Sequence, residues 1–267
     1  MSNDELVQLA QRVADAIPAD AAPEIVLTGS VSRGMADDVS DIEMLVVTRE
    51  PLTLEQCFEL AGAAGLENLD TWGPQAGQGR RVSGVREGVP LELVWWPREY
   101  AEERVSSTAD ALAHGVSLRT IGLLAAWQER LREYPRELAA ARIEEAALPW
   151  GGFAAAGLLT LVRPGEALAL TEWLVDGATR VLAIVFAMNR VWQPTTKRVA
   201  VRVAPLAVKP DRLAERIEEA LTQRDPRRAL LVMTELQLDT VRLAPDGPMV
   251  DRARTWLAEG ARILSDG

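Results

Sequence analysis

Two carboxylates separated by one residue, Asp41 and Glu43, stand just before the apolar run Met44–Val47. A short apolar run is typical of a buried strand, and residues two apart on a strand point to the same side. We therefore expect the two carboxylates to converge while Ile42 faces the core. Two like charges held side by side repel each other, and a cation between them relieves that repulsion. A hard divalent cation with oxygen ligands is the natural candidate.

Two further features can join this pair of carboxylates. Gly29 and Ser30 follow the apolar run Ile25–Leu27, and Glu92 stands between two leucines of a third apolar run. In a small sheet in which these strands are neighbours, the three acids can form one cluster beside the glycine–serine turn. Backbone N–H groups of a turn that opens a helix attract phosphate oxygens. Divalent ions held by the carboxylates can clamp the attacking and leaving oxygens of an in-line displacement. The pattern indicates a site for metal ions and a polyphosphate.

Each of these features also has a simpler interpretation when it is taken alone. A Gly-Ser pair after a strand is commonly just a turn, and an Asp-x-Glu at a strand start is commonly a solvated edge. Glu92 could be the polar face of an edge strand. The order and spacing of the three features together favour the functional interpretation.

The first part of the chain mixes helix and strand signals. Helical spacing of apolar residues predicts helices over 4–17 and 53–64, with Thr53 as the N-cap of the second. The runs 81–85 and 89–95 flank Glu87-Gly88, which predicts a β-hairpin. The segment 72–79 is rich in glycine and polar residues and is predicted to be a loop.

Strand signals nearly vanish from about Tyr100 onward. Apolar residues at helical spacing predict helices at Ile121–Leu131, Arg136–Leu148, Ala167–Trp192, Asp211–Leu221, Pro226–Leu243 and Pro248–Leu264. The expected fold is therefore α+β: a small mixed sheet with flanking helices, followed by an all-helical C-terminal domain. We expect a catalytic domain over 1–108 and a helical, substrate-binding domain over 109–267.

Composition and charge narrow the classes of function. The 267 residues carry a formal net charge of −10, which argues against a nucleic-acid surface and an anionic membrane, because both depend on clustered Lys and Arg. Cys57 is the only cysteine and His114 the only histidine, which excludes an intrachain disulfide and any site built on several imidazoles or thiolates. Cys57 has helical apolar neighbours and is expected in the core. The N-terminus lacks a signal-peptide pattern, so a cytoplasmic protein is expected.

The motifs resemble those of a known superfamily. GSVSRG, then SDIE, then the hydrophobic–Glu–hydrophobic strand LEL resemble the nucleotidyltransferases with a DNA polymerase β-like palm. SDIE with its apolar tail EMLVV is most similar to the kanamycin (aminoglycoside) nucleotidyltransferases. The segments AHG, before the helical region, and MNRVWQPTTKR, after a long helix, also look like that group. The motif match covers Ile25–Val47 and Leu91–Leu93.

The resemblance implies transfer of a nucleoside monophosphate, AMP from ATP, to a hydroxyl of a small molecule such as an aminoglycoside-like antibiotic, with two Mg²⁺ ions. It implies that Asp41 and Glu43 bind the metals and that Glu92 completes the catalytic metal site. The nucleotide contacts that it implies are Gly29, Ser30, Arg33, Ser40, Thr195 and Lys197. Arg33 could instead cap its helix or pair with Asp37, and Lys197 could be a solvated helix end. The resemblance also suggests a homodimer.

The sequence departs from the family in the second domain. The kanamycin enzymes place a glutamate base there, and the segment that aligns with it, 153–157, contains no acid. The base could be Glu92, or Glu166 or Glu172, or the acceptor could differ. Two other functions stay open: modification of a protein hydroxyl, as in toxin–antitoxin nucleotidyltransferases, and a nucleotide-binding regulatory module without turnover.

Overall fold

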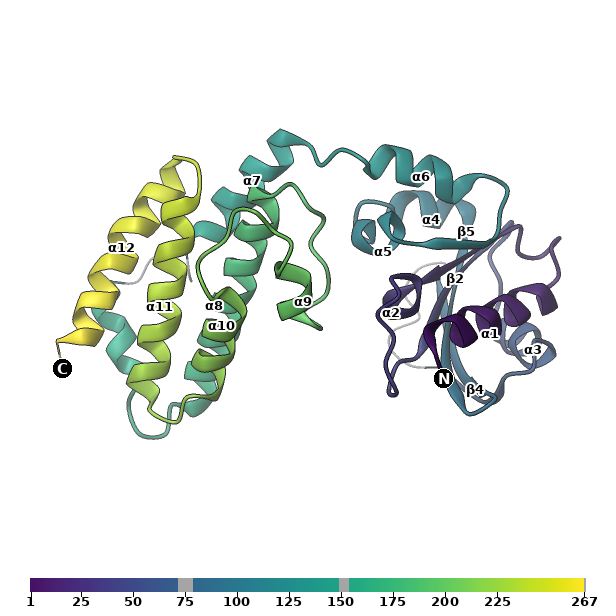
Figure 1. Ribbon diagram of the computed structural model, residues 1–267, viewed down its shortest axis with the longest axis horizontal. Helices are drawn as coiled ribbons and strands as arrows, with labels where there is room; N and C mark the ends of the chain where they lie inside the picture. The colour runs from purple at the N-terminus through teal and green to yellow at the C-terminus, as the bar shows by residue number, and fades with distance from the viewer. Residues whose placement is uncertain (72–78, 149–153, 267) are drawn as a thin grey trace. The chain divides into compact units, whose positions relative to one another are not determined.

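The computed structural model describes residues 1–71, 79–148 and 154–266. The chain forms two compact units, Met1–Arg132 and Glu133–Gly267 (Figure 1). The predicted loop at 72–79 lies outside the described residues except for its last residue, and the segment 153–157 lies outside them at its first.

Unit 1 is built on one mixed sheet of six strands in the order β3-β4-β5-β2-β1-β6. Its central pair, β2 and β5, is parallel, and the other neighbours are antiparallel. The predicted hairpin is confirmed as β4 and β5, joined at Glu87-Gly88. The strands are β1 (Glu24–Thr28), β2 (Ile42–Thr48), β3 (Glu67–Asp70), β4 (Arg80–Arg86), β5 (Val89–Pro97) and β6 (Val116–Arg119).

Helices cover both faces of this sheet (Figure 1). On one face, α1 (Asn3–Ala16) and α3 (Leu54–Ala63) share a core with alternate residues of β5, Leu91, Leu93 and Trp95. The residues between them, Glu92 among them, therefore belong to the opposite face. That face meets α4 (Arg98–Arg104) and α6 (Leu123–Leu131). The short helices α2 (Gly29–Ser32) and α5 (Ala109–Ala113) complete the unit.

The predicted helices of this unit form close to their expected bounds. Thr53 is the N-cap of α3, as predicted: its side chain accepts a hydrogen bond from the N–H of Gln56, and Gln56 bonds back to the N–H of Thr53. This capping box satisfies donors that a helix start leaves without partners. Cys57 is fully buried, as expected.

The segment 109–132, expected at the start of the second domain, packs within unit 1. It carries α5, β6 and α6, and β6 pairs with β1 at the edge of the sheet. The carboxylate of Glu24, on β1, fixes the start of α6 by accepting hydrogen bonds from the N–H groups of Ile121, Leu123 and Leu124. The sheet therefore extends further along the chain than the predicted boundary at residue 108.

Unit 2 contains helices and, within its described residues, no strand. Its most apolar helix, α8, packs against α7 and α11, and α12 packs against α11. This agrees with the near-continuous apolar character of the α8 sequence, since a helix that is apolar on most sides belongs inside a bundle. The helices are α7 (Arg136–Ala147), η2 (Ala155–Thr160), α8 (Ala167–Met188), α9 (Val199–Val203), α10 (Leu213–Thr222), α11 (Pro226–Leu243) and α12 (Pro248–Ser265).

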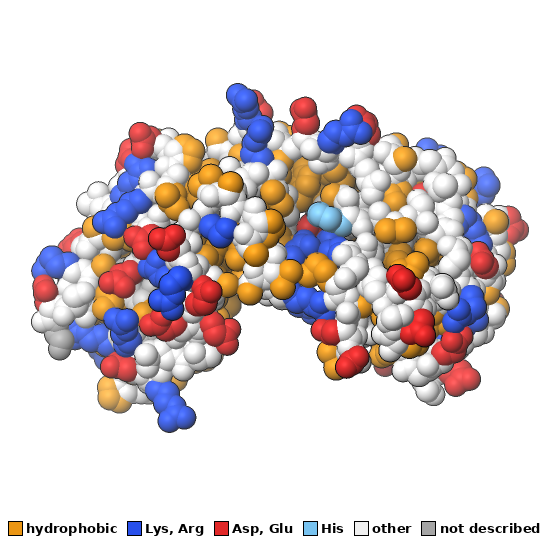
Figure 2. Space-filling view, in the orientation of Figure 1, with side chains coloured by type: hydrophobic (Ala, Val, Ile, Leu, Met, Phe, Trp, Pro, Cys, Tyr) orange, Lys and Arg blue, Asp and Glu red, His pale blue; other side chains and the backbone are white. Residues whose placement is uncertain are grey.

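The predicted α+β class, with a mixed sheet followed by a helical region, is confirmed. None of the described helices combines the length and the apolar character needed to cross a bilayer. On the face shown in Figure 2, acidic and basic side chains are interspersed over both units. The net charge of −10 is thus not concentrated in one patch of that face.

Candidate functional site

Four polar residues form one row across the sheet. Thr28 of β1 is opposite Glu43 of β2, Glu43 is opposite Glu92 of β5, and Glu92 is opposite Ser83 of β4. Residues directly opposite each other on paired strands have their side chains on the same face. The structure therefore brings two of the predicted acids, Glu43 and Glu92, into neighbouring positions, although they lie 49 residues apart in the sequence (92 − 43).

The glycine of the predicted turn is required by its surroundings. Gly29 follows β1 directly and has a φ of +71°, a conformation that residues with a Cβ adopt only at a cost. A Cβ at this position would also overlap the carboxylate of Glu43. The backbone of the turn and the acid of β2 are thus in direct contact, as the spacing of the two motifs predicts.

The turn before β2 is closed by its own side chains. The hydroxyl of Ser40 donates to Oδ1 of Asp37 (2.8 Å) and accepts from the N–H of Asp37 (2.9 Å). Asp41 follows at once, one residue before β2 begins, and is partly buried. The turn fixes the backbone next to Asp41. Ser40 therefore has a structural role, and its contact with a nucleotide stays a prediction.

Arg33 has a partner that the sequence analysis did not foresee. Its Nη2 donates to the carboxylate (2.6 Å) and to the backbone oxygen (2.9 Å) of Asp110, on α5. The two side chains are only 11% and 15% exposed. This pair with Asp110 ties the loop after β1 to α5. His114 adds a contact between Nδ1 and the backbone oxygen of Asp110 (3.0 Å).

Glu92 lies beside a basic residue of the next strand. Arg81 Nε is 3.9 Å from Glu92 Oε1, and the Glu92 side chain is 18% exposed. A guanidinium near two adjacent carboxylates reduces their mutual repulsion. Glu92 therefore faces the partly exposed side of the sheet and not its α1–α3 core.

Carboxylates are the type of ligand that a hard cation takes, and the structure places two of the three predicted acids next to each other. Glu43 and Glu92 are direct neighbours and supply the oxygen donors that Mg²⁺ takes. Across the described ranges of the chain, no group of three or more His, Cys, Asp or Glu side chains is gathered tightly enough to hold a metal ion. Ligation by Asp41, Glu43 and Glu92 therefore stays a prediction.

The predicted residues of the second domain all belong to unit 2. Thr195 and Lys197 lie on the segment between α8 and α9 and are exposed. Glu166 is the N-cap residue of α8, and Glu172 is on its exposed face. Their contribution to the site of unit 1 stays a prediction.

Two residues that hold the site region together were missed from the sequence. Asp110 anchors Arg33 and His114, and Glu24 anchors α6 to β1. Asp110 stands in an ordinary helical stretch, which gives no signal. Glu24 directly precedes an apolar run. An acid at the first position of a buried strand was the one sequence signal that could have indicated its role.

Comparison with known proteins gives a distant likeness in structure. Neither the search with protein-family models nor the search of curated proteins found a match. Among solved structures, the chain is similar to a nucleotidyltransferase-like protein from Exiguobacterium sibiricum 255-15, with 12% sequence identity, a TM-score of 0.38 and coverage of 95% of this chain and 88% of that one. A likeness of this size carries no argument about activity or site residues.

Proposed function

We propose that the chain is a nucleotidyltransferase that transfers AMP from ATP to a hydroxyl of a small molecule. The observation that supports it is the parallel pairing of β2 with β5, which sets Glu43 beside Glu92 and against the Gly29 turn. Two adjacent acids at a tight backbone turn are suited to a cation and a polyphosphate. The motifs that carry the family resemblance are the same residues.

In this proposal Asp41, Glu43 and Glu92 hold Mg²⁺, which supplies positive charge to the reacting phosphate when it is bound. The Gly29 turn lets the triphosphate approach the backbone, and the hydroxyl groups of Ser30 and Ser40 contact it. Arg33, which is held by Asp110, positions this loop and reaches the triphosphate only with its remaining N–H groups. Thr195 and Lys197 are the nucleotide contacts that the family resemblance implies within unit 2.

The chemistry is a single in-line displacement. The acceptor oxygen forms a bond to the α-phosphorus, the bond from that phosphorus to the bridging oxygen of the β-phosphate breaks, and pyrophosphate leaves with the bonding electrons. The hydroxyl proton passes to a carboxylate, for which Glu92 is the candidate in unit 1 and Glu166 or Glu172 in unit 2. The rate gain comes from positioning and from charge neutralisation at the phosphate.

The test measures pyrophosphate release and the mass of the acceptor. The full chain is incubated with Mg²⁺, each of the four nucleoside triphosphates and a panel of aminoglycosides and other polyols. We expect pyrophosphate together with an acceptor heavier by one nucleotide. Asp41→Asn should abolish both signals, while Glu59→Gln, an exposed change on α3, should leave them unchanged.

Other outcomes separate the competing functions. Label from the nucleotide appearing on a protein would identify a protein hydroxyl as the acceptor. Tight nucleotide binding without pyrophosphate release from any mixture would identify a binding module without turnover. A fully active Asp41→Asn variant would contradict the role proposed for this carboxylate.

A further inference from the structure

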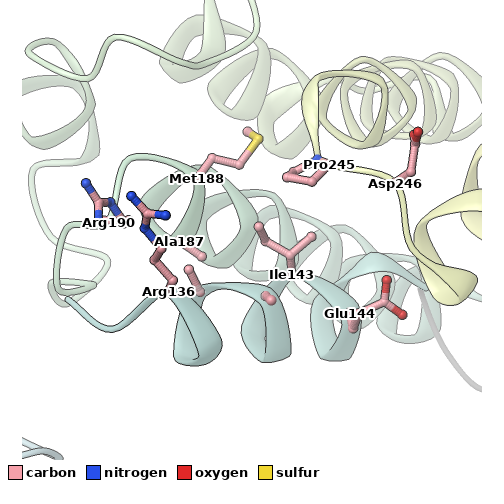
Figure 3. A pocket seen from close by; sticks show the side chains of 10 residues that line it. Arg136, Ile143, Glu144, Ala187, Met188, Arg190, Pro245 and Asp246 are labelled. Atoms are coloured by element: carbon pink, nitrogen blue, oxygen red, sulfur yellow. The ribbon is translucent and has the colours of Figure 1, made fainter.

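A cavity of about 240 Å³ opens on unit 2 between α7, the end of α8 and the segment that joins α11 to α12 (Figure 3). Its apolar wall is made by Ile143, Ala187, Met188 and Pro245. Ligand pockets typically have about 300–1,000 Å³, so this cavity is slightly smaller than that range. The cavity therefore has the size and the lining for a small organic molecule.

Two arginines stand together at one end of this cavity. Arg136 is the first residue of α7, and Arg190 follows the end of α8. Figure 3 shows their guanidinium groups side by side. Within residues 1–71, 79–148 and 154–266, neither guanidinium forms a hydrogen bond or an ion pair. Two adjacent guanidinium groups without a carboxylate attract an anion, and their planar geometry matches carboxylate and phosphate oxygens.

The acids that line the cavity already have partners. Glu144, at the opposite end in Figure 3, accepts a hydrogen bond from the N–H of Met249 (2.9 Å). Asp246 is paired with Arg254 at 2.6 Å. Neither of these two acids forms an ion pair with Arg136 or Arg190.

The arginine end is also held in shape before any ligand binds. The Asn189 side chain donates to the backbone oxygen of Val208 (2.7 Å) and accepts from its N–H (2.9 Å), which fixes the chain just after α8. Arg190 has a φ of +51°, which is uncommon for a residue with a side chain. The rings of Tyr134 and Trp192 are in contact, with centroids 4.6 Å apart and planes tilted by 49°, which brings together the two segments that carry the arginines. A site formed in advance loses less conformational entropy on binding.

We propose that this cavity binds a small organic anion. Its carboxylate or phosphate group lies between Arg136 and Arg190, and its apolar body lies on Ile143 and Met188, whose flexible thioether adapts to the shape of the ligand. The site is made by residues of unit 2 alone. It does not depend on the nucleotidyl transfer proposed for the acids of unit 1.

The test uses isothermal titration calorimetry on the full chain with defined probes. Benzoate and phenyl phosphate carry the two anion types on one apolar ring. Benzyl alcohol has the ring without the charge, and acetate and inorganic phosphate have the charge without the ring. We expect the aromatic anions to bind at least about tenfold more tightly than the other three, a difference of about 1.4 kcal/mol. Whichever of benzoate and phenyl phosphate binds more tightly shows whether the site prefers a carboxylate or a phosphate.

Variants separate the cavity from the rest of the surface. The double variant Arg136→Gln/Arg190→Asn removes both charges, and asparagine tolerates the positive φ at position 190. Ala140→Trp fills the cavity from an exposed position on α7. Arg252→Gln removes a positive charge from an exposed position on α12 and serves as the control.

We expect the double variant and Ala140→Trp each to weaken benzoate and phenyl phosphate binding by about tenfold or more, and Arg252→Gln to leave it unchanged. Circular dichroism checks that all variants are folded. Three results would overturn the proposal: neither aromatic anion binds at millimolar concentration, the folded cavity variants bind as the native protein does, or acetate and phosphate bind as tightly as their aromatic counterparts.

Discussion

Replacement of Glu24 tests whether one buried carboxylate joins α6 to the sheet. This side chain is fully buried at the start of β1. Its Oε2 accepts from the N–H groups of Ile121 (2.7 Å) and Leu123 (3.2 Å), and its Oε1 accepts from the N–H of Leu124 (3.2 Å). The Thr120 hydroxyl donates to the same carboxylate. These are donors that the start of a helix cannot satisfy by itself.

The expected cost follows from the groups left without a partner. Glu24→Ala removes the acceptor for Leu123 and Leu124, whose hydrogen bonds are buried. Ile121 is exposed and its N–H can turn to water. At about 1–3 kcal/mol for each of these two unsatisfied buried groups, we expect a loss of about 2–6 kcal/mol of unfolding free energy. Glu24→Gln keeps one acceptor oxygen and places an NH₂ group at the position of the other. We therefore expect it to lower the unfolding free energy by about 1–3 kcal/mol.

Urea unfolding followed by circular dichroism measures the total loss of unfolding free energy in each variant. Amide hydrogen exchange over 123–131 reports the local effect, which is needed because two units need not unfold together. Glu59→Gln, an exposed change on α3, should shift the unfolding free energy by less than about 0.5 kcal/mol. If Glu24→Ala costs no more than Glu59→Gln and exchange over α6 is unchanged, this role of Glu24 is refuted.

Three further predictions concern unit 1. Gly29→Ala should cost about 1–2 kcal/mol for the positive φ alone, and it should also displace the Glu43 carboxylate, which a crystal structure of the variant would show. Burial raises the pKa of the Cys57 thiol to about 12, so Cys57 should react with a thiol reagent only after unfolding. Because this pKa is raised, the buried neutral thiol contributes stability that is fully present below pH 9.0 and is lost as the pH rises toward about 12. Cys57→Ser should remove this part of the loss of stability at alkaline pH. Burial would raise the pKa of Glu102, but hydrogen bonds from Trp127 and Arg130 outweigh it and lower the pKa; stability should therefore fall as pH drops through the acid range, and less so in Glu102→Gln.

Each of these predictions has a result that contradicts it. For Gly29, that result is an unmoved Glu43 side chain in a variant of native stability. For Cys57, it is rapid labelling of the folded protein near neutral pH. For Glu102, it is an acid limb of the stability curve that is identical in the native protein and in Glu102→Gln.

Most elements could be predicted because their signals are local. The hairpin around Glu87-Gly88 and the capping box that begins at Thr53 form where the sequence places them. The strand β6 was missed, because four residues with two partly buried side chains give no clear alternation. Its formation depends on pairing with β1, about 90 residues earlier in the chain. The predicted boundary at residue 108 was placed before this strand for the same reason.

The site could be predicted in type but not in detail. The spacing of Gly29 from Glu43 predicted a turn beside an acid, and the structure shows that contact. The partner of Arg33 could not be predicted, because Asp110 reaches it only after α5 has packed near the loop. The cavity with Arg136 and Arg190 gave no sequence signal, since one arginine begins α7 and the other follows α8, far apart in the chain.

The sequence by itself determined most of the helices and strands and the kinds of side chain available for chemistry, because these depend on periodicity and on neighbours along the chain. The tertiary structure decided which acids are adjacent, since the pairing of β2 with β5 alone sets Glu43 opposite Glu92. It also decided that Arg33 is bound to Asp110 and that Glu24 holds the start of α6. These contacts join residues 49 to 100 positions apart, and only packing brings such residues together.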